Sequence, residues 1–180
     1  SDTPDMDCAW MDAYVDPSNG ASFPTNGTTP SGHTIFEFDG TSMTLSADLN
    51  LDGCKLILKG SALQVKSTAN IAPVINLTDG GSLVVTTSPD TGDVGELSAF
   101  DGVYGLHLNI VSGALILDGG ILRQVALDSS YDAALFIGEG AELHMLNGGI
   151  IYGSSTTSPT TATVKIDGGT VNIADSSIIN

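Results

Sequence analysis

Basic residues are scarce in this chain of 180 residues, which has 5 Lys and Arg against 21 Asp and Glu and a formal net charge of −16 at pH 7. Such a surface repels nucleic acids and anionic membranes, so neither is expected as a partner. Polar residues interrupt every apolar run, including that from Leu106 to Leu117. These runs fall short of the roughly 20 residues that a membrane-spanning helix needs, so no membrane insertion is expected.

Cysteine is also rare, with only Cys8 and Cys54. The three separated histidines do not complete a metal site with them. A disulfide that ties the N-terminal segment to the residues around Cys54 is the simplest expectation, and it implies an oxidising, extracytoplasmic location. Two unpaired buried thiols are the alternative. The phosphate-binding loop, the dinucleotide fingerprint and the G-x-S-x-G motif are all absent.

What the chain has is a repeat of the form Gly or Ser, two small or polar residues, apolar, any residue, apolar. Six copies begin at Gly40, Gly60, Gly80, Ser112, Gly140 and Gly168. Short apolar-x-apolar runs lie between them, punctuated by Asp-Gly or Asn-Gly pairs that suit tight corners. A strand of this kind buries its inner face only when equivalent strands stack on it. We therefore predict an all-β, single-domain parallel β-helix (β-solenoid) of about five to six coils over residues 34–180.

Residues 1–33 lack the repeat and contain Trp10, the only Trp. We interpret them as a capping and assembly segment, with Trp10 as a plug on the first coil. Polar insertions are expected at Thr86–Gly95, Arg123–Asp132 and Gly153–Thr161, the last two projecting from the same side of the solenoid. Arg123 is interpreted as a solvated residue of its insertion.

The G-x-x-apolar-x-apolar coils and Asx-Gly corners of residues 34–180 resemble the right-handed parallel β-helix class, seen in secreted adhesins, autotransporter passenger domains and pectate-lyase-like enzymes. The resemblance implies the fold and an extracellular or cell-surface location. It does not assign an activity, since one fold hosts many functions. No catalytic residue is assigned.

Calcium is the one cofactor that the sequence suggests. Asp48, Asn50 and Asp52 match the start of a calcium loop, but Lys59 stands where the loop needs a bidentate Glu. Leu49 and Leu51 alternate with them, so a half-buried strand is the favoured interpretation. Asn26 and Asn76 begin N-x-Thr glycosylation motifs, a pattern that chance alone also produces. His107 and His144 are expected to point outward from their strands.

Aligning the six repeats places one outward residue between the two apolar anchors of each copy: Thr44, Gln64, Val84, Ile116, His144 and Asn172. This column is not the ladder of Thr residues that ice-binding solenoids present. Val84 and Ile116 are neighbours in it, and we interpret them as a lateral contact patch. A position beneath an insertion is the alternative.

After the last repeat the chain contains only seven more residues, with no polar or proline-rich cover. Ile173, Ile178 and Ile179 are therefore expected at an open solenoid end, which either continues in a longer protein or is covered by another subunit. Head-to-tail stacking of copies would generate a filament. The favoured function is thus an extracellular structural subunit or module of a surface filament, sheath or adhesin. A carbohydrate-binding or polysaccharide-cleaving β-helix that engages surface glycans is the second hypothesis, and an ice-binding protein is the third.

Overall fold

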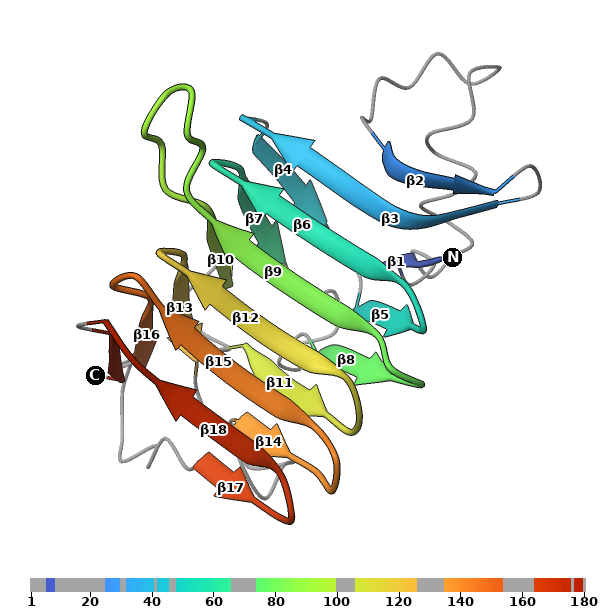
Figure 1. Cartoon of the computed structure of the whole chain (residues 1–180), viewed down its shortest axis with the longest axis vertical. Helices are drawn as coiled ribbons and strands as arrows, with labels where there is room; N and C mark the ends of the chain where they lie inside the picture. Colours follow the sequence, from blue (N-terminus) through green and yellow to red (C-terminus); the bar gives the residue numbers. More distant parts are fainter. Residues whose placement is uncertain are drawn as a thin grey trace.

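The structure is a computed structural model that describes residues 6–8, 25–29, 32–40, 42–45, 48–65, 74–99, 106–125, 135–153, 164–175 and 177–179. Over these residues every named element is a β-strand, and the strands form three sheets. The sheets run side by side along the long axis of the molecule, with successive coils following one another from top to bottom (Figure 1).

Each sheet takes strands from successive coils. Sheet A has the spatial order β1 (Met6–Asp7), β5 (Leu49–Asp52), β8 (Val74–Thr78), β11 (His107–Ile110), β14 (Leu135–Ile137) and β17 (Val164–Ile166). Sheet B has β2 (Thr25–Thr29), β3 (Gly32–Asp39), β6 (Lys55–Lys59), β9 (Ser82–Thr86), β12 (Ala114–Asp118), β15 (Glu142–Leu146) and β18 (Thr170–Ile173). Sheet C has β4 (Ser42–Leu45), β7 (Ala62–Val65), β10 (Glu96–Ala99), β13 (Ile121–Val125), β16 (Ile150–Gly153) and β19 (Ile178–Ile179).

The chain visits the sheets in the fixed order B, C, A. One coil consists of β3, β4 and β5; the same path recurs in β6–β8, β9–β11, β12–β14 and β15–β17, and β18 and β19 begin the next coil. Among the named strands only the pairing of β2 with β3 is antiparallel. Parallel pairing of equivalent strands defines a parallel β-solenoid, so the predicted fold class is confirmed.

Alternation along each strand separates the core from the surface. In β6, for example, Leu56 and Leu58 are buried, whereas Lys55, Ile57 and Lys59 lie on the outer face. The inward side chains of all three sheets form one core that follows the axis, including Phe36, Leu49, Leu63, Ile75, Leu83, Leu97, Leu108, Leu115, Leu122, Leu135, Leu143 and Ile151. Each fully buried aliphatic side chain contributes about 1.5–3 kcal/mol, so the stack supplies the stability that no single coil has.

The Asx-Gly pairs form corners, as predicted. At the corner before β9, Asp79 and Gly80 both have positive φ (50° and 75°), and Asn147 and Gly148 repeat this before β16 (51° and 80°). Such turns accept Asp and Asn because their short side chains tolerate the left-handed region. The next residue, Gly81, is required for a different reason. A Cβ there would lie 1.9 Å from the carbonyl oxygen of Leu51, which belongs to the neighbouring strand β5 on the N-terminal side.

The single column of six repeats inferred from the sequence is wrong. Leu83, Leu115, Leu143 and Val171 do pair in sheet B. However, Met43 pairs with Leu63 in sheet C, and the partner of Leu63 in the next coil is Leu97. The corner that enters sheet B and the corner that enters sheet C both need glycine, so the motif marks a corner without saying which sheet follows it.

The predicted insertions fall at two different corners. Residues 126–134 connect β13 to β14, and residues 154–163 connect β16 to β17, so both lie between sheets C and A. By contrast, residues 87–95 connect β9 to β10, between sheets B and C. This segment forms a short hairpin, with an antiparallel bridge from Thr87 to Val94, and projects from the solenoid as the loop at the upper left of Figure 1.

Candidate functional site

The C-terminal coil exposes apolar side chains. The equivalent positions of the preceding coil hold buried core residues. In sheet A, Val164 and Ile166 are the register partners of the buried Leu135 and Ile137. In sheets B and C, Ile173 and Ile179 follow Met145 and Ile151 in the same way. The exposed fractions are 41% for Val164, 52% for Ile166, 47% for Ile173 and 42% for Ile179.

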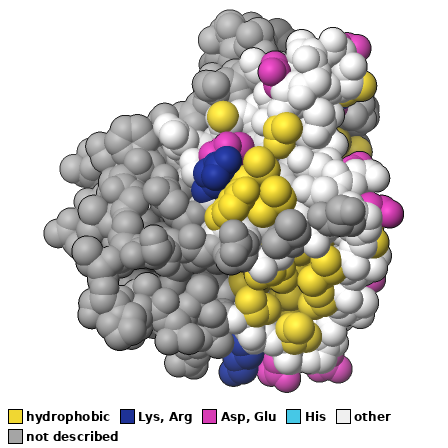
Figure 2. Space-filling view, turned by 90° about the vertical axis from the view of Figure 1, so that its left-hand side faces the viewer, with side chains coloured by type: hydrophobic (Ala, Val, Ile, Leu, Met, Phe, Trp, Pro, Cys, Tyr) yellow, Lys and Arg dark blue, Asp and Glu magenta, His cyan; other side chains and the backbone are white. Residues whose placement is uncertain are grey.

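This end face arises because β17, β18 and β19 are the last strands of their sheets. In the side view of Figure 2, hydrophobic side chains lie in the middle and lower half of the coloured surface, and basic and acidic side chains lie at its lower edge. Lys165, Asp167 and Asp175 are exposed around the end face. Of the residues predicted at an open end, Ile173 and Ile179 are exposed in the last strands of sheets B and C; the sequence prediction did not include Val164 and Ile166. The side chain of Ile178 lies outside the description, as does the whole of Trp10.

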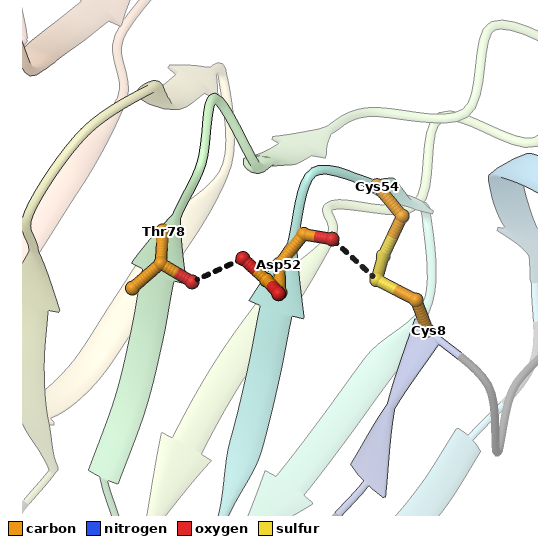
Figure 3. Close-up of a disulfide and its surroundings, with 4 residues drawn as sticks. All are labelled: Cys8, Asp52, Cys54 and Thr78. Atoms are coloured by element: carbon orange, nitrogen blue, oxygen red, sulfur yellow. Dashed lines mark hydrogen bonds between the residues drawn. A yellow bond between two sulfur atoms is a disulfide. The ribbon is translucent and has the colours of Figure 1, made fainter.

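At the opposite end, strands from the N-terminal segment lie on the first coil. Met6 and Asp7 pair with Leu49 and Asn50 in sheet A, and β2 pairs with β3 in sheet B. Cys8 follows β1 directly and is bonded to Cys54, with 6.0 Å between the two Cα atoms, so the predicted pairing is present. Figure 3 shows the Cys8 sulfur beside the carbonyl oxygen of Asp52, at 3.4 Å. The bond therefore attaches the N-terminal segment to the corner between β5 and β6.

Of the calcium candidates, Asn50 and Asp52 lie on strand β5 and Asp48 directly precedes it, and all three bond to the next coil. Asp48 Oδ1 accepts a hydrogen bond from the backbone N–H of Val74 (2.9 Å), and Asp52 Oδ1 accepts one from Thr78 Oγ1 (3.0 Å; Figure 3). Alternate residues of a strand are about 6.6 Å apart, whereas calcium ligands all lie within about 2.6 Å of the ion. Residues 49–52 therefore form the strand of the favoured interpretation, and no calcium loop forms over residues 48–52.

Asn50 begins a ladder of amide side chains along the outer face of sheet A. Asn76 Nδ2 donates to Asn50 Oδ1 (2.7 Å), and Asn109 Nδ2 donates to Asn76 Oδ1 (3.1 Å). The register places these three residues on adjacent coils. The glycosylation candidate Asn76 is thus engaged on both sides of its amide group. Asn26, the other candidate, lies in β2, and its side chain is outside the description.

The lateral patch is larger than predicted and lies in a different column. Val84 and Ile116 are register partners on adjacent coils, as expected, but their outward neighbour toward the N terminus is Ile57 rather than Gln64. Ile57, Val84 and Ile116 are half-buried. His144 continues the column, lies on the outer face and has Nε2 3.3 Å from Glu142.

The predicted position of Arg123 is wrong, and His107 is less exposed than a surface histidine would be. Arg123 lies in strand β13 rather than in an insertion; its Nε forms an ion pair with Glu96 Oε1 (2.9 Å), and its guanidinium lies 4.8 Å from the centre of the Tyr152 ring. The register of β10, β13 and β16 brings these residues together from three coils. His107 shares the outer face of β11 with Asn109, as alternation along the strand requires, but it is buried there, with 7% of its surface exposed.

Within the described ranges, no group of three or more His, Cys, Asp or Glu side chains is arranged to hold a metal ion. The same ranges contain no helix that is both long and apolar enough to cross a bilayer. Comparisons of the chain with protein-family models, with curated proteins and with solved structures gave no match.

Proposed function

We propose that this protein is an extracellular structural β-solenoid, a subunit or module of a surface filament, sheath or adhesin that assembles end to end. The observation that supports this most directly is the exposed apolar end formed by Val164, Ile166, Ile173 and Ile179. These side chains occupy core positions by register and lack only the next coil.

Two kinds of interaction would hold copies together at this end. The outer edges of β17, β18 and β19 offer backbone groups to further strands, as in strand augmentation. Burial of four half-exposed aliphatic side chains adds about 1 kcal/mol each. That total of about 4 kcal/mol only reaches the lower limit of the cost of association, so the strand edges must contribute as well. A contact between unlike ends repeats without closing and builds a filament.

The location outside the cytoplasm rests on the Cys8–Cys54 disulfide, since such bonds persist in oxidising compartments. The charge of −16 keeps individual copies soluble and apart at low ionic strength. Assembly is therefore expected to strengthen as salt screens this repulsion.

Lysine substitutions at the exposed end test the proposal. Ile166→Lys and Ile173→Lys should abolish filaments in negative-stain microscopy and remove the large, filamentous species in sedimentation, because both bring a charge into the end-to-end contact. Val94→Lys and Val111→Lys are matched controls: these residues are 45% and 44% exposed but lie in the hairpin and at the corner after β11. Wild-type protein that stays monomeric at every concentration, or end variants that polymerise normally, would contradict the proposal.

A glycan-binding role is the second candidate, supported by the grouping of Tyr152, Arg123 and Glu96 on sheet C. An aromatic ring flanked by polar groups is a suitable sugar platform, and the insertions at residues 126–134 and 154–163 follow strands β13 and β16 of the same sheet in the chain. Specific binding on a glycan array that Tyr152→Ala removes would favour it. Ice binding has less support, because the central column of sheet B contains Glu37, Ile57, Val84, Ile116, His144 and Asn172 rather than threonines.

A further inference from the structure

The outer face of sheet B combines an apolar centre with charged side chains on both sides of it. Ile57, Val84 and Ile116 form the centre, on the adjacent strands β6, β9 and β12. In Figure 1 the strands of this sheet face the viewer side by side. The flanking outward positions of β9 and β12 hold Ser82, Thr86 and Ala114, together with Asp118, whose carboxylate accepts a hydrogen bond from the side-chain amide of Asn147.

Two of the charged residues on this face, Lys55 and Glu142, lie on opposite sides of the apolar centre along the axis. Lys55 lies on β6, toward the N-terminal end, and has no ion-pair partner among the described residues. On the same strand, the Nζ atom of Lys59 lies 3.8 Å from Glu37 Oε1 and 3.9 Å from Asp39 Oδ2. Glu142 lies on β15, toward the C-terminal end; its side chain is 51% exposed, and its only ionic contact within the described part of the chain is His144.

The positions of Lys55 and Glu142 suit a two-fold axis that lies in the face parallel to the strands. This axis reverses the order of the coils, so β6 of one copy faces β15 of the other and β9 faces β12. Residues at the same position along the strand then face each other, as the register defines them: Lys55 with Glu142, Ile57 with His144, Ser82 with Ala114, and Val84 with Ile116. Opposite charges meet at both ends of such an interface, and no facing pair carries like charges.

The other two-fold axis, parallel to the solenoid, is unfavourable. It keeps the coil order and reverses the position along each strand, so Lys55 would face Lys59, and Glu37 would face the Glu37 of the second copy. Like charges in a contact cost free energy and select against a partner arrangement.

We propose that the outer face of sheet B is a homodimer interface in which two copies pack face to face, with their strands parallel and their coil order reversed. Val84 packs on Ile116 at the centre, and Lys55 pairs with Glu142 at both ends. This contact is independent of the end-to-end assembly and leaves the C-terminal face free.

The geometry of the face sets the strength of the dimer. Six strands spaced about 4.8 Å apart, each presenting about five residues at 3.3 Å, span roughly 29 by 16 Å. The corresponding planar area, about 460 Å² per copy, is below the roughly 800 Å² per partner of a standard interface. The dimer is therefore weak and dependent on concentration.

Charge reversal separates specific pairing from general repulsion. Lys55→Glu and Glu142→Lys should each weaken the dimer about tenfold or more in sedimentation equilibrium, because each variant places like charges at two symmetry-related contacts. The double variant Lys55→Glu/Glu142→Lys should restore the wild-type dissociation constant, with the net charge again −16. If net charge alone mattered, Glu142→Lys would strengthen the dimer, and that result would overturn the proposal.

The apolar centre gives a second test. Val84→Asp and Ile116→Asp should each abolish the dimer, whereas Val111→Asp, which adds the same charge to an exposed valine away from this face, should not. Circular dichroism checks that each variant is folded, and Ile173→Lys should leave this dimer intact while removing filaments. A wild-type protein that remains monomeric at about millimolar concentration and physiological salt would refute the interface, whatever else the face then binds.

Discussion

Ile137 and Ile166 are neighbours in sheet A with the same orientation toward the axis, yet Ile137 is fully buried and Ile166 is 52% exposed. The same contrast separates Met145 from Ile173 in sheet B. Both members of each pair belong to the same sequence pattern. The difference shows that a side chain in this molecule is buried only when a coil lies on each side of its own. The sequence pattern therefore predicts which side chains point toward the axis, but it does not predict whether they are buried.

Truncation of the two isoleucines should show the largest difference. Ile137→Ala removes a buried side chain between two coils and should lower the free energy of unfolding by about 3–4 kcal/mol. Ile166→Ala should lower it by less than about 1 kcal/mol, because half of that side chain already contacts water. Urea unfolding of monomeric protein with the disulfide intact measures both. Equal losses would mean that the last coil is covered in solution.

Two corner glycines provide a smaller contrast. A Cβ at Gly81 would lie 1.9 Å from the backbone oxygen of Leu51, whereas at Gly169 the nearest atom, 2.4 Å away, belongs to the side chain of Ile137. Gly81→Ala should therefore cost about 2–3 kcal/mol, because two coils must separate. Gly169→Ala should cost less, since a side chain moves more easily than a strand. Thermal unfolding of both variants under the same conditions tests this order, and the reverse order would contradict the packing described.

The amide ladder should give the smallest effect. Asn76→Ala removes the hydrogen bonds to Asn50 and Asn109 and should cost about 1–2 kcal/mol. Asn172 is exposed in β18, and its side chain has no hydrogen bond to the described residues, so Asn172→Ala is the matched control with no expected change. Amide exchange of β5 and β11 should increase in the first variant only. An unaffected Asn76→Ala would show that water replaces the ladder at no cost.

The sequence predicted local structure well and contacts between coils poorly. All six repeats form strands: β4, β7, β9, β12, β15 and β18. Their distribution over two sheets was not predictable from the motif, because both kinds of corner need glycine. Asn50 and Asn76 are 26 residues apart, but Asn76 and Asn109 are 33 apart. Because the coils differ in length, such ladders have no constant spacing in the sequence and cannot be recognised from it. The ion pair of Arg123 with Glu96 could not be predicted for the same reason.

The disulfide between Cys8 and Cys54 also determines how the molecule would respond to a pull along its axis. Tension applied to the chain before Cys8 passes through the covalent bond to Cys54, at the start of the second coil. The bond protects the chain between Cys8 and Cys54, a sequence separation of 46, from this tension. Without the bond, this segment could extend by roughly 150 Å at about 3.4 Å per residue. Under oxidising conditions the molecule would behave as a short, stiff link. Reduction of one bond would convert its first coil into a long extensible tether.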